Sequence, residues 1–257
     1  MNKMLPFIFL VGLSCLAQTS TKTVKVEYVL DTNFSIKWQR FYTLQASNIN
    51  ALCVEKRPEI KGSLLGRSSE GENKTATMIH WEPSNKTPEF YYSDYDTMGV
   101  VFMKNVSDKL HYVKDTVSLN WVLTNEQKLI NDFICDKATL NFRGRDYVAW
   151  YTKEIPIPAG PYKFSGLPGL ILTIDSVDQQ VSFKATSITY DGNSAVVIND
   201  LTPLNTTIYS LQDFLKRENE LIEIDNKLFH AKYAPPLTPY KICDNCREPG
   251  IEIFNPN

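Results

Sequence analysis

The amino-acid sequence predicts a mainly β fold of the α+β class: a curved antiparallel sheet or half-barrel, with one long helix from the C-terminal half packed against it. Most of the chain divides into short segments rich in β-branched and aromatic residues, separated by polar turns. Of the 257 residues, 43% are hydrophobic and 12% aromatic, which suffices for a buried core. Apolar residues recur with helical spacing most clearly after residue 210.

The N-terminal segment predicts export. Residues 1–17 contain one early lysine, a short apolar stretch and the small residue Ala17, as in a secretory signal peptide. The apolar stretch is shorter than the roughly 20 residues that a membrane-spanning helix needs. We therefore expect cleavage after Ala17, a single β-rich domain over residues 18–257, and no transmembrane span in the mature chain. Lipidation at Cys15 is the alternative.

The first half of the chain contains six segments with strand-like composition. Residues 56–72 are polar and contain glycine and serine, so a loop is expected there. The surroundings of Asp94 and Asp96 are also polar and suit a solvated loop. The expected strands are residues 23–30, 49–55, 76–81, 100–104, 110–114 and 119–123.

A hairpin is expected in the middle of the chain. Residues 128–139 and 147–152 flank a turn in which Gly144 can supply a positive φ. The following residues, 155–161, contain three prolines that remove backbone donors. This proline segment is expected along an edge of the sheet or over its surface, and not as a central strand.

Two further strands and a helix complete the prediction. Residues 170–174 are apolar, as in a strand covered on both faces, and residues 181–186 alternate between apolar and polar. Ser210 can cap a helix of about five turns, at 3.6 residues per turn, with Asp213 reaching back to it. Its apolar stripe consists of Phe214, Leu215, Leu221, Ile222, Leu228 and Phe229.

The sequence Gly166-Leu167-Pro168-Gly169-Leu170-Ile171 predicts a rigid bend before a strand. Pro168 and Gly169 fit the two central positions of a type II turn. With the surrounding words Cys135-Asp136-Lys137-Ala138, Gly144 to Thr152, Glu154 to Pro158 and Gly160 to Phe164, this motif resembles the GLPGLI family of secreted proteins. The resemblance is dense from about residue 120 to residue 174. It implies export in a Gram-negative envelope, to the periplasm, the outer membrane or beyond, and it brings no established activity, substrate or catalytic residue.

Composition and spacing exclude several functions. The 27 basic residues nearly balance the 29 acidic ones, so nucleic-acid binding is not expected. His80, His111 and His230 are isolated from other metal ligands, which argues against a zinc site. Ser165 lacks the flanking glycines of a nucleophile elbow. No cofactor and no catalytic residue are therefore predicted.

Four cysteines would remain after export: Cys53, Cys135, Cys243 and Cys246. Three pairings are open, and we favour a disulfide between Cys243 and Cys246 because they are close in sequence. Cys53 and Cys135 would then be paired with each other or buried as thiols. The alternative function is a thiol- or metal-dependent activity at Cys243 and Cys246.

The predicted function is that of a non-enzymatic envelope protein, binding a hydrophobic or peptidic ligand or an outer-membrane partner. The bend and its aromatic neighbours have two interpretations: they pack in the core, or they form the rim of a binding groove. A large open apolar cavity would favour a ligand carrier, and a filled core would favour a partner-binding protein. The candidate rim residues are Trp150, Tyr162, Phe164, Leu167 and Pro168.

Overall fold

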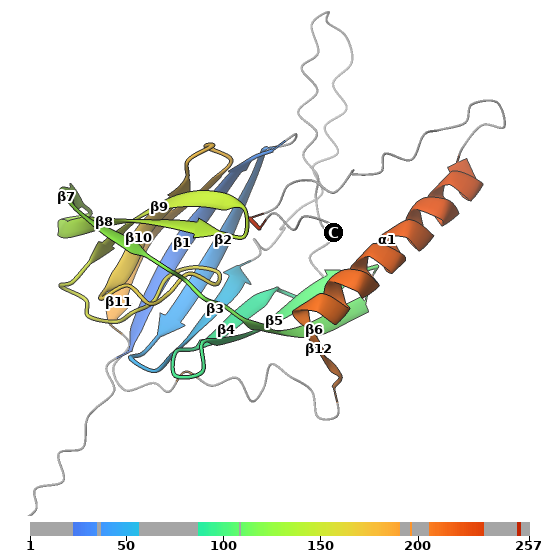
Figure 1. Ribbon diagram of the computed structural model, residues 1–257, viewed down its shortest axis with the longest axis horizontal. Helices are drawn as coiled ribbons and strands as arrows, with labels where there is room; N and C mark the ends of the chain where they lie inside the picture. Colours follow the sequence, from blue (N-terminus) through green and yellow to red (C-terminus); the bar gives the residue numbers. More distant parts are fainter. Residues whose placement is uncertain are drawn as a thin grey trace, which may run out of the picture.

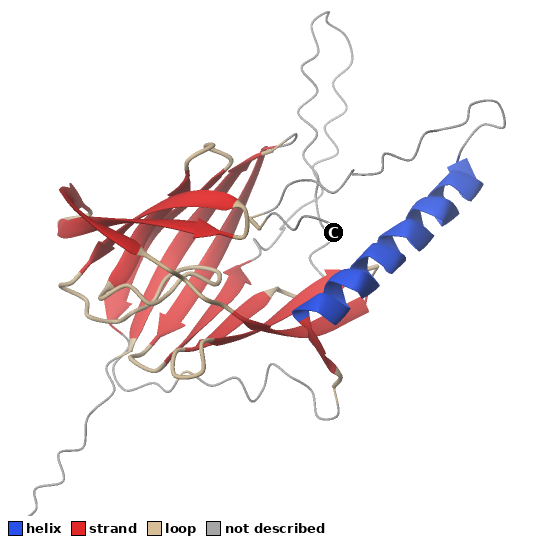
Figure 2. Ribbon diagram, viewed as in Figure 1, coloured by secondary structure: helices blue, strands red, loops and turns tan. Residues whose placement is uncertain are grey.

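The computed structural model describes residues 23–34, 37–56, 87–107, 109–190, 196, 206–233 and 251–252. These residues form one 12-stranded sheet and one helix (Figure 1 and Figure 2). The elements are β1 Val24–Asn33, β2 Lys37–Ala46, β3 Asn50–Lys56, β4 Phe90–Asp94, β5 Gly99–Val106, β6 Lys109–Thr116, β7 Val122–Ile130, β8 Phe133–Phe142, β9 Arg145–Thr152, β10 Leu170–Ser176, β11 Val181–Tyr190, β12 Ile208–Ser210 and α1 Leu211–Tyr233.

The sheet is open and strongly curled. Its strand order is β12-β6-β5-β4-β3-β2-β1-β11-β10-β9-β8-β7, and every neighbouring pair is antiparallel except β12 and β6. β1 pairs with both β2 and β11, which joins the N-terminal strands to the later ones. The curl brings strands that are far apart in this order to face each other (Figure 1). The prediction of a mainly β fold with a curved antiparallel sheet is confirmed.

The core lies on the concave side, because alternate residues of each strand point there. A row across neighbouring strands shows this: Val26, Leu44, Cys53, Tyr91 and Phe102 follow each other in register, and all are buried. On β11, Val181, Phe183 and Ala185 are buried while the residues between them are not, as the alternation predicted. The apolar strand β10 is likewise buried over its first three residues.

The sequence analysis missed three strands: β2, β4 and the short β12. Residues 90–94 were expected as a solvated loop, yet they pair with β3 and β5, and the Asp94 carboxylate accepts a hydrogen bond from Thr97 N in the β4–β5 turn. The error arose because tyrosines beside acidic residues suit a loop as well as a strand with one polar face. The strand expected at 76–81 and the loop expected at 56–72 lie outside the described residues, save for residue 56 at the end of β3.

The central hairpin is confirmed, with one correction. β8 and β9 pair across a tight turn in which both Arg143 and Gly144 have positive φ. The expected strand over 128–139, however, is interrupted at Asn131 and Asp132, which turn the chain between β7 and β8. β7 thereby becomes an edge strand, with most of its side chains exposed.

The proline segment, residues 155–161, is buried and does not run over the surface. Ile155, Ile157 and Ala159 point into the core, while Pro156 is exposed and Pro158 half-buried. Backbone donors are satisfied by short-range bonds, such as Ile157 N to Ile155 O at 2.8 Å and Ala159 N to Ile157 O at 2.7 Å. The segment is not a strand, as expected. Its apolar residues alternate with proline, so one side of an extended chain can be buried without a ladder of hydrogen bonds.

The bend at Gly166–Ile171 is not the type II turn that was predicted. That turn requires a positive φ at Gly169, whereas the positive φ lies at Gly166, at 87°. Gly169 is needed for a different reason: a Cβ there would come within 2.0 Å of the carbonyl oxygen of Thr152. The bend therefore brings the backbone at Gly169 into close contact with Thr152 at the end of β9.

The single helix begins as predicted but packs over a short length. Ser210 Oγ accepts a hydrogen bond from Asp213 N at 3.1 Å and donates one to the Asp213 carboxylate at 2.6 Å. Phe214 and Leu221 are buried, whereas Ile222 and Leu228 are exposed. The expectation of a long helix resting on the sheet is thus wrong in this respect, since α1 packs mainly on β5, β6 and β12 and then projects beyond them (Figure 2). α1 is not apolar enough to cross a membrane, and no other helix is described.

Candidate functional site

Four charged side chains meet on the concave side of the sheet: Asp115, Arg143, Lys163 and Glu252. Asp115 lies on β6, Arg143 in the β8–β9 turn, Lys163 after the proline segment, and Glu252 in the C-terminal part of the chain. β6 and β8 lie near opposite ends of the strand order. The cluster therefore forms only because the sheet curls.

Each cation of this charge cluster contacts both carboxylates. Lys163 Nζ lies 3.0 Å from Asp115 Oδ2 and 2.6 Å from Glu252 Oε1. Arg143 lies 2.7 Å from Asp115 Oδ1 and also pairs with Glu252 Oε2. The side chain of Lys163 is only 2% exposed and those of the two carboxylates 3%, so water screens these ion pairs weakly.

Aromatic residues surround the charge cluster and complete its hydrogen bonds. The Tyr162 hydroxyl donates to Glu252 Oε1, and the Tyr147 hydroxyl donates to the carbonyl oxygen of Ile251 at 2.6 Å. Burial, followed by the negative charge of Glu252, raises the pKa of Tyr162 well above its ordinary value, so the phenol keeps its proton and remains a donor. Lys163 Nζ also lies 4.3 Å from the centre of the Phe102 ring, a cation–π contact.

Two of the donors, Tyr162 and Arg143, are among the seven described non-glycine residues that have a positive φ. Tyr162 has φ 60° and Arg143 has φ 46°, in the left-handed region that bulky residues rarely adopt. At Tyr162 the conformation is held by Phe164, whose N–H donates to Pro161 O at 3.1 Å and whose ring contacts Phe142, Tyr147 and Phe183. Strain of this kind persists where the surrounding packing fixes it, and it occurs often at functional sites.

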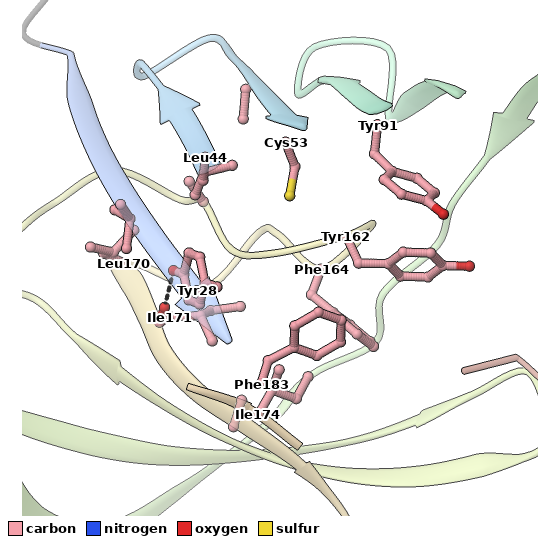
Figure 3. Close-up of a cluster of buried hydrophobic side chains, with 14 of the residues drawn as sticks. Tyr28, Leu44, Cys53, Tyr91, Tyr162, Phe164, Leu170, Ile171, Ile174 and Phe183 are labelled. Atoms are coloured by element: carbon pink, nitrogen blue, oxygen red, sulfur yellow. Dashed lines mark hydrogen bonds between the residues drawn. The ribbon is translucent and has the colours of Figure 1, made fainter. Parts of the chain in front are cut away.

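The five candidate rim residues do not form one exposed surface. Tyr162, Phe164 and Leu167 are buried, Trp150 is half-buried beneath Lys128 Nζ at 4.1 Å, and Pro168 is exposed. Figure 3 shows Tyr162 and Phe164 among the core side chains, with the Tyr162 ring facing Tyr91 of β4. The expected rim is incorrect for the three buried residues, because the segment that carries them lies inside the curl. A binding role for Trp150 and Pro168 stays a prediction.

The described cysteines are free thiols. Cys53 and Cys135 are not bonded to each other and both are buried, so of the two alternatives they are buried thiols. Burial raises the pKa of Cys53 to about 12 and that of Cys135 to about 11. Cys243 and Cys246, the favoured disulfide pair, lie outside the described residues, as does His80, and nothing in the structure supports a thiol or metal activity there.

Sequence reasoning missed the charge cluster. Its members come from four separated parts of the chain, and no spacing pattern links them. One signal was available: Lys163 stands between two aromatic residues in a segment whose glycine, proline and apolar content indicates burial, and a buried lysine needs a partner.

A depression of about 300 Å³ occurs in the described part of the chain, away from the charge cluster. It is lined largely by polar and charged residues of β1, β2 and β3, on the face opposite Val26 and Leu44. The lining residues are Lys25, Glu27, Thr43, Gln45, Leu52, Val54, Glu55 and Lys56. No group of three or more metal-ligating side chains occurs in the described ranges.

Residues 142–173 match the model of a family described as "Protein of unknown function (Porph_ging)". The match covers Arg143, Tyr162, Lys163 and the bend Gly166–Ile171, within the stretch that carries the resemblance to GLPGLI proteins. No curated protein matches the sequence.

Among solved structures, the chain is similar to PNGF-II in two crystal forms. In the C2 form the TM-score is 0.51, with 14% identity over 79% of this chain and 33% of that one; in the P21 form it is 0.52, with 14% identity over 76% and 32%. The chain thus spans about a third of the length of PNGF-II. Two other structures are a DUF1329 family protein from Desulfovibrio piger, with TM-score 0.35, 9% identity and coverage of 70% and 90%, and a putative outer membrane lipoprotein-sorting protein domain from Vibrio parahaemolyticus, with 0.34, 7%, and 72% and 92%. At these identities, the likeness to PNGF-II establishes a shared fold for the curled sheet.

Proposed function

We propose that this chain is an exported, non-enzymatic protein of the cell envelope that binds a peptidic partner and does not carry a small hydrophobic molecule. The observation that carries the proposal is the material that fills the concave side of the sheet. It is polypeptide: the buried segment 155–169, and the pair Ile251–Glu252 held by the charge cluster.

The filled interior argues against a carrier. Sites for apolar ligands are concave, mostly apolar, and enclose about 300–1,000 Å³. In the described part of this chain, the rings of Tyr162 and Phe164 occupy the middle of the curl, and each contacts rings from facing strands. A depression found there lies on the other face, and six of its eight lining residues are polar or charged. These observations support recognition of a protein partner.

Export and envelope location rest on residues 1–17, which have the pattern of a signal peptide, and on the resemblance to secreted GLPGLI proteins. These residues lie outside the described part of the chain. The partner would accordingly be met in the periplasm or at the outer membrane.

Native mass spectrometry of protein purified from its own envelope separates carrier from partner-binding protein. We expect the bare polypeptide mass, with an N-terminus after Ala17, and no saturable binding of the fluorescent apolar probe N-phenyl-1-naphthylamine. A stoichiometric lipid that organic solvent extracts from the folded protein would contradict the proposal.

Peptide recognition itself is tested by panning a random peptide library against the immobilised protein. We expect enriched peptides whose binding weakens in Arg143→Gln and is unchanged in Arg217→Gln, the same substitution at an exposed position of α1. If no peptide is enriched, the proposed function is wrong.

A further inference from the structure

The pair Ile251–Glu252 is held in the way a bound peptide is held. The backbone of the pair accepts one hydrogen bond, from the Tyr147 hydroxyl to the carbonyl oxygen of Ile251 at 2.6 Å. The Glu252 carboxylate has three partners: it forms ion pairs with Lys163 and Arg143 and accepts a hydrogen bond from Tyr162. Ile251 is half-buried against the main core. An aliphatic residue followed by a carboxylate is therefore the unit that these contacts recognise.

The charges explain why a second carboxylate is needed. Without Glu252, the buried Lys163 would keep only the carboxylate of Asp115, which also pairs with Arg143. Lys163 is buried against the Phe102 ring and has little access to water. A buried charge without compensation strongly destabilises the folded protein. The sheet and its loops thus place three donors, Lys163, Arg143 and Tyr162, where they favour a second carboxylate, and Glu252 supplies it.

The residues that surround Ile251–Glu252 are positioned by contacts within the sheet and its loops. Asp115 is paired in register with Val100 of β5, and Tyr147 with Leu140 of β8. Arg143 is fixed in the tight turn between β8 and β9. Tyr162 and Lys163 precede Phe164, whose ring is packed on three sides. None of these contacts involves Ile251 or Glu252, so the donors are preorganised for an incoming carboxylate.

We propose that Arg143, Tyr147, Tyr162 and Lys163 form a carboxylate site for an acidic peptide segment of a partner protein, with an aliphatic residue followed by glutamate, and that Ile251–Glu252 is the resident competitor for this site. The inference rests on the proposed function and names the chemistry of its partner. The partner binds by displacing the resident pair, and its carboxylate takes the same three donors.

The probe for the test is a fluorescein-labelled peptide with the chain's own sequence from Pro249 to Asn257, and its match is the same peptide with glutamine in place of glutamate. Fluorescence anisotropy is measured with the full-length wild type and with Glu252→Gln, which keeps the size of the competing side chain and removes its charge. A tethered competitor acts at a millimolar effective concentration. We therefore expect the glutamate peptide to bind Glu252→Gln at least about tenfold more tightly than the wild type.

Two controls assign the binding to the site. The glutamine peptide is expected to bind at least about tenfold more weakly, the loss that one charged hydrogen bond brings. Adding Arg143→Gln to Glu252→Gln is expected to weaken binding to a similar extent, and adding Arg217→Gln to leave it unchanged. Circular dichroism establishes that each variant is folded. Wild-type protein titrated with each peptide to millimolar concentration is expected to show the same preference for the glutamate peptide, which tests the site without any substitution.

Three results would overturn the inference. The first is equal binding of the two peptides, and the second is binding that Arg143→Gln does not weaken. The third is a wild type that dimerises with concentration and loses this property in Glu252→Gln, because the occupant would then be a second copy. In all three cases, library peptides that bind elsewhere on the protein would leave the proposed function intact.

Discussion

Cys53 shows how completely the curl isolates one side chain. It lies on β3 between Leu44 of β2 and Tyr91 of β4, and it is 1% exposed (Figure 3). Its thiol has a pKa of about 12 because burial disfavours the thiolate, which is the reactive form. At neutral pH the side chain behaves as a small apolar group.

We expect Cys53 to resist iodoacetamide in the native protein at neutral pH and to react when the protein is unfolded in guanidinium. Mass spectrometry of the tryptic peptides measures both states. Cys135, whose pKa is about 11, should be protected in the same way. Labelling of native Cys53 at the rate of the unfolded control would show that the core opens around it.

Residue-level prediction worked where a side chain's neighbours are close in sequence. The cap formed by Ser210 and Asp213 could be predicted because both partners lie within one turn. Lys163 could not be placed, because its partners Asp115 and Glu252 are brought to it by the curl. The same holds for Tyr28, whose hydroxyl donates to Ile171 O at 2.5 Å across 143 residues of sequence.

At the scale of elements, the bend before β10 depends on two glycines for different reasons. Gly166 has φ 87° and no atom within 4 Å of an added Cβ, so a side chain would meet backbone strain only. Gly169 has an ordinary φ, but an added Cβ would overlap the Thr152 carbonyl. Close approach, and not turn type, is thus what fixes the residue at position 169.

We expect Gly169→Ala to destabilise the protein by about 3 kcal/mol or more, because β9 must move away from the bend. Gly166→Ala, the matched control, should cost about 1–2 kcal/mol, the strain of a left-handed residue. Urea unfolding followed by tryptophan fluorescence measures both. Equal costs would contradict the argument from close approach.

Elements with regular patterns were predicted, and elements without them were not. The hairpin β8–β9, the strands β10 and β11 and the start of α1 each carry a local period or turn signal. The proline segment has neither ladder nor helix, and its burial depends on the cavity that the other strands create. The sequence also could not predict how much of α1 packs on the sheet, since this length is set by where β5, β6 and β12 end.

On the scale of the whole molecule, the charge cluster links two distant parts of the sheet. Asp115 belongs to β6, near one end of the strand order, and Arg143 to the turn before β9, near the other. The sheet ladder does not connect these strands directly. Their ion pair, with Lys163 between them, therefore helps to hold the curl at its present width.

Removing one carboxylate should consequently weaken the entire fold. We expect Asp115→Asn to lower the free energy of unfolding by about 3–5 kcal/mol, because Arg143 and the buried Lys163 must then share the single carboxylate of Glu252 within the cluster. Asp136→Asn, at a carboxylate paired with the exposed Lys153, should cost less than about 1 kcal/mol. Urea unfolding of both variants provides the comparison, and similar losses would show that Asp115 does not hold the curl.

The pairing of Arg143 with Glu252 spans 109 residues of sequence, so the two partners are synthesised at different times. A chain that leaves the ribosome N-terminus first delivers all twelve strands before it delivers Glu252. Until that moment Lys163 has only one carboxylate to meet. Glu252 therefore supplies its counter-charge to Lys163 only after all twelve described strands have been synthesised, so the charge balance inside the curl is completed late.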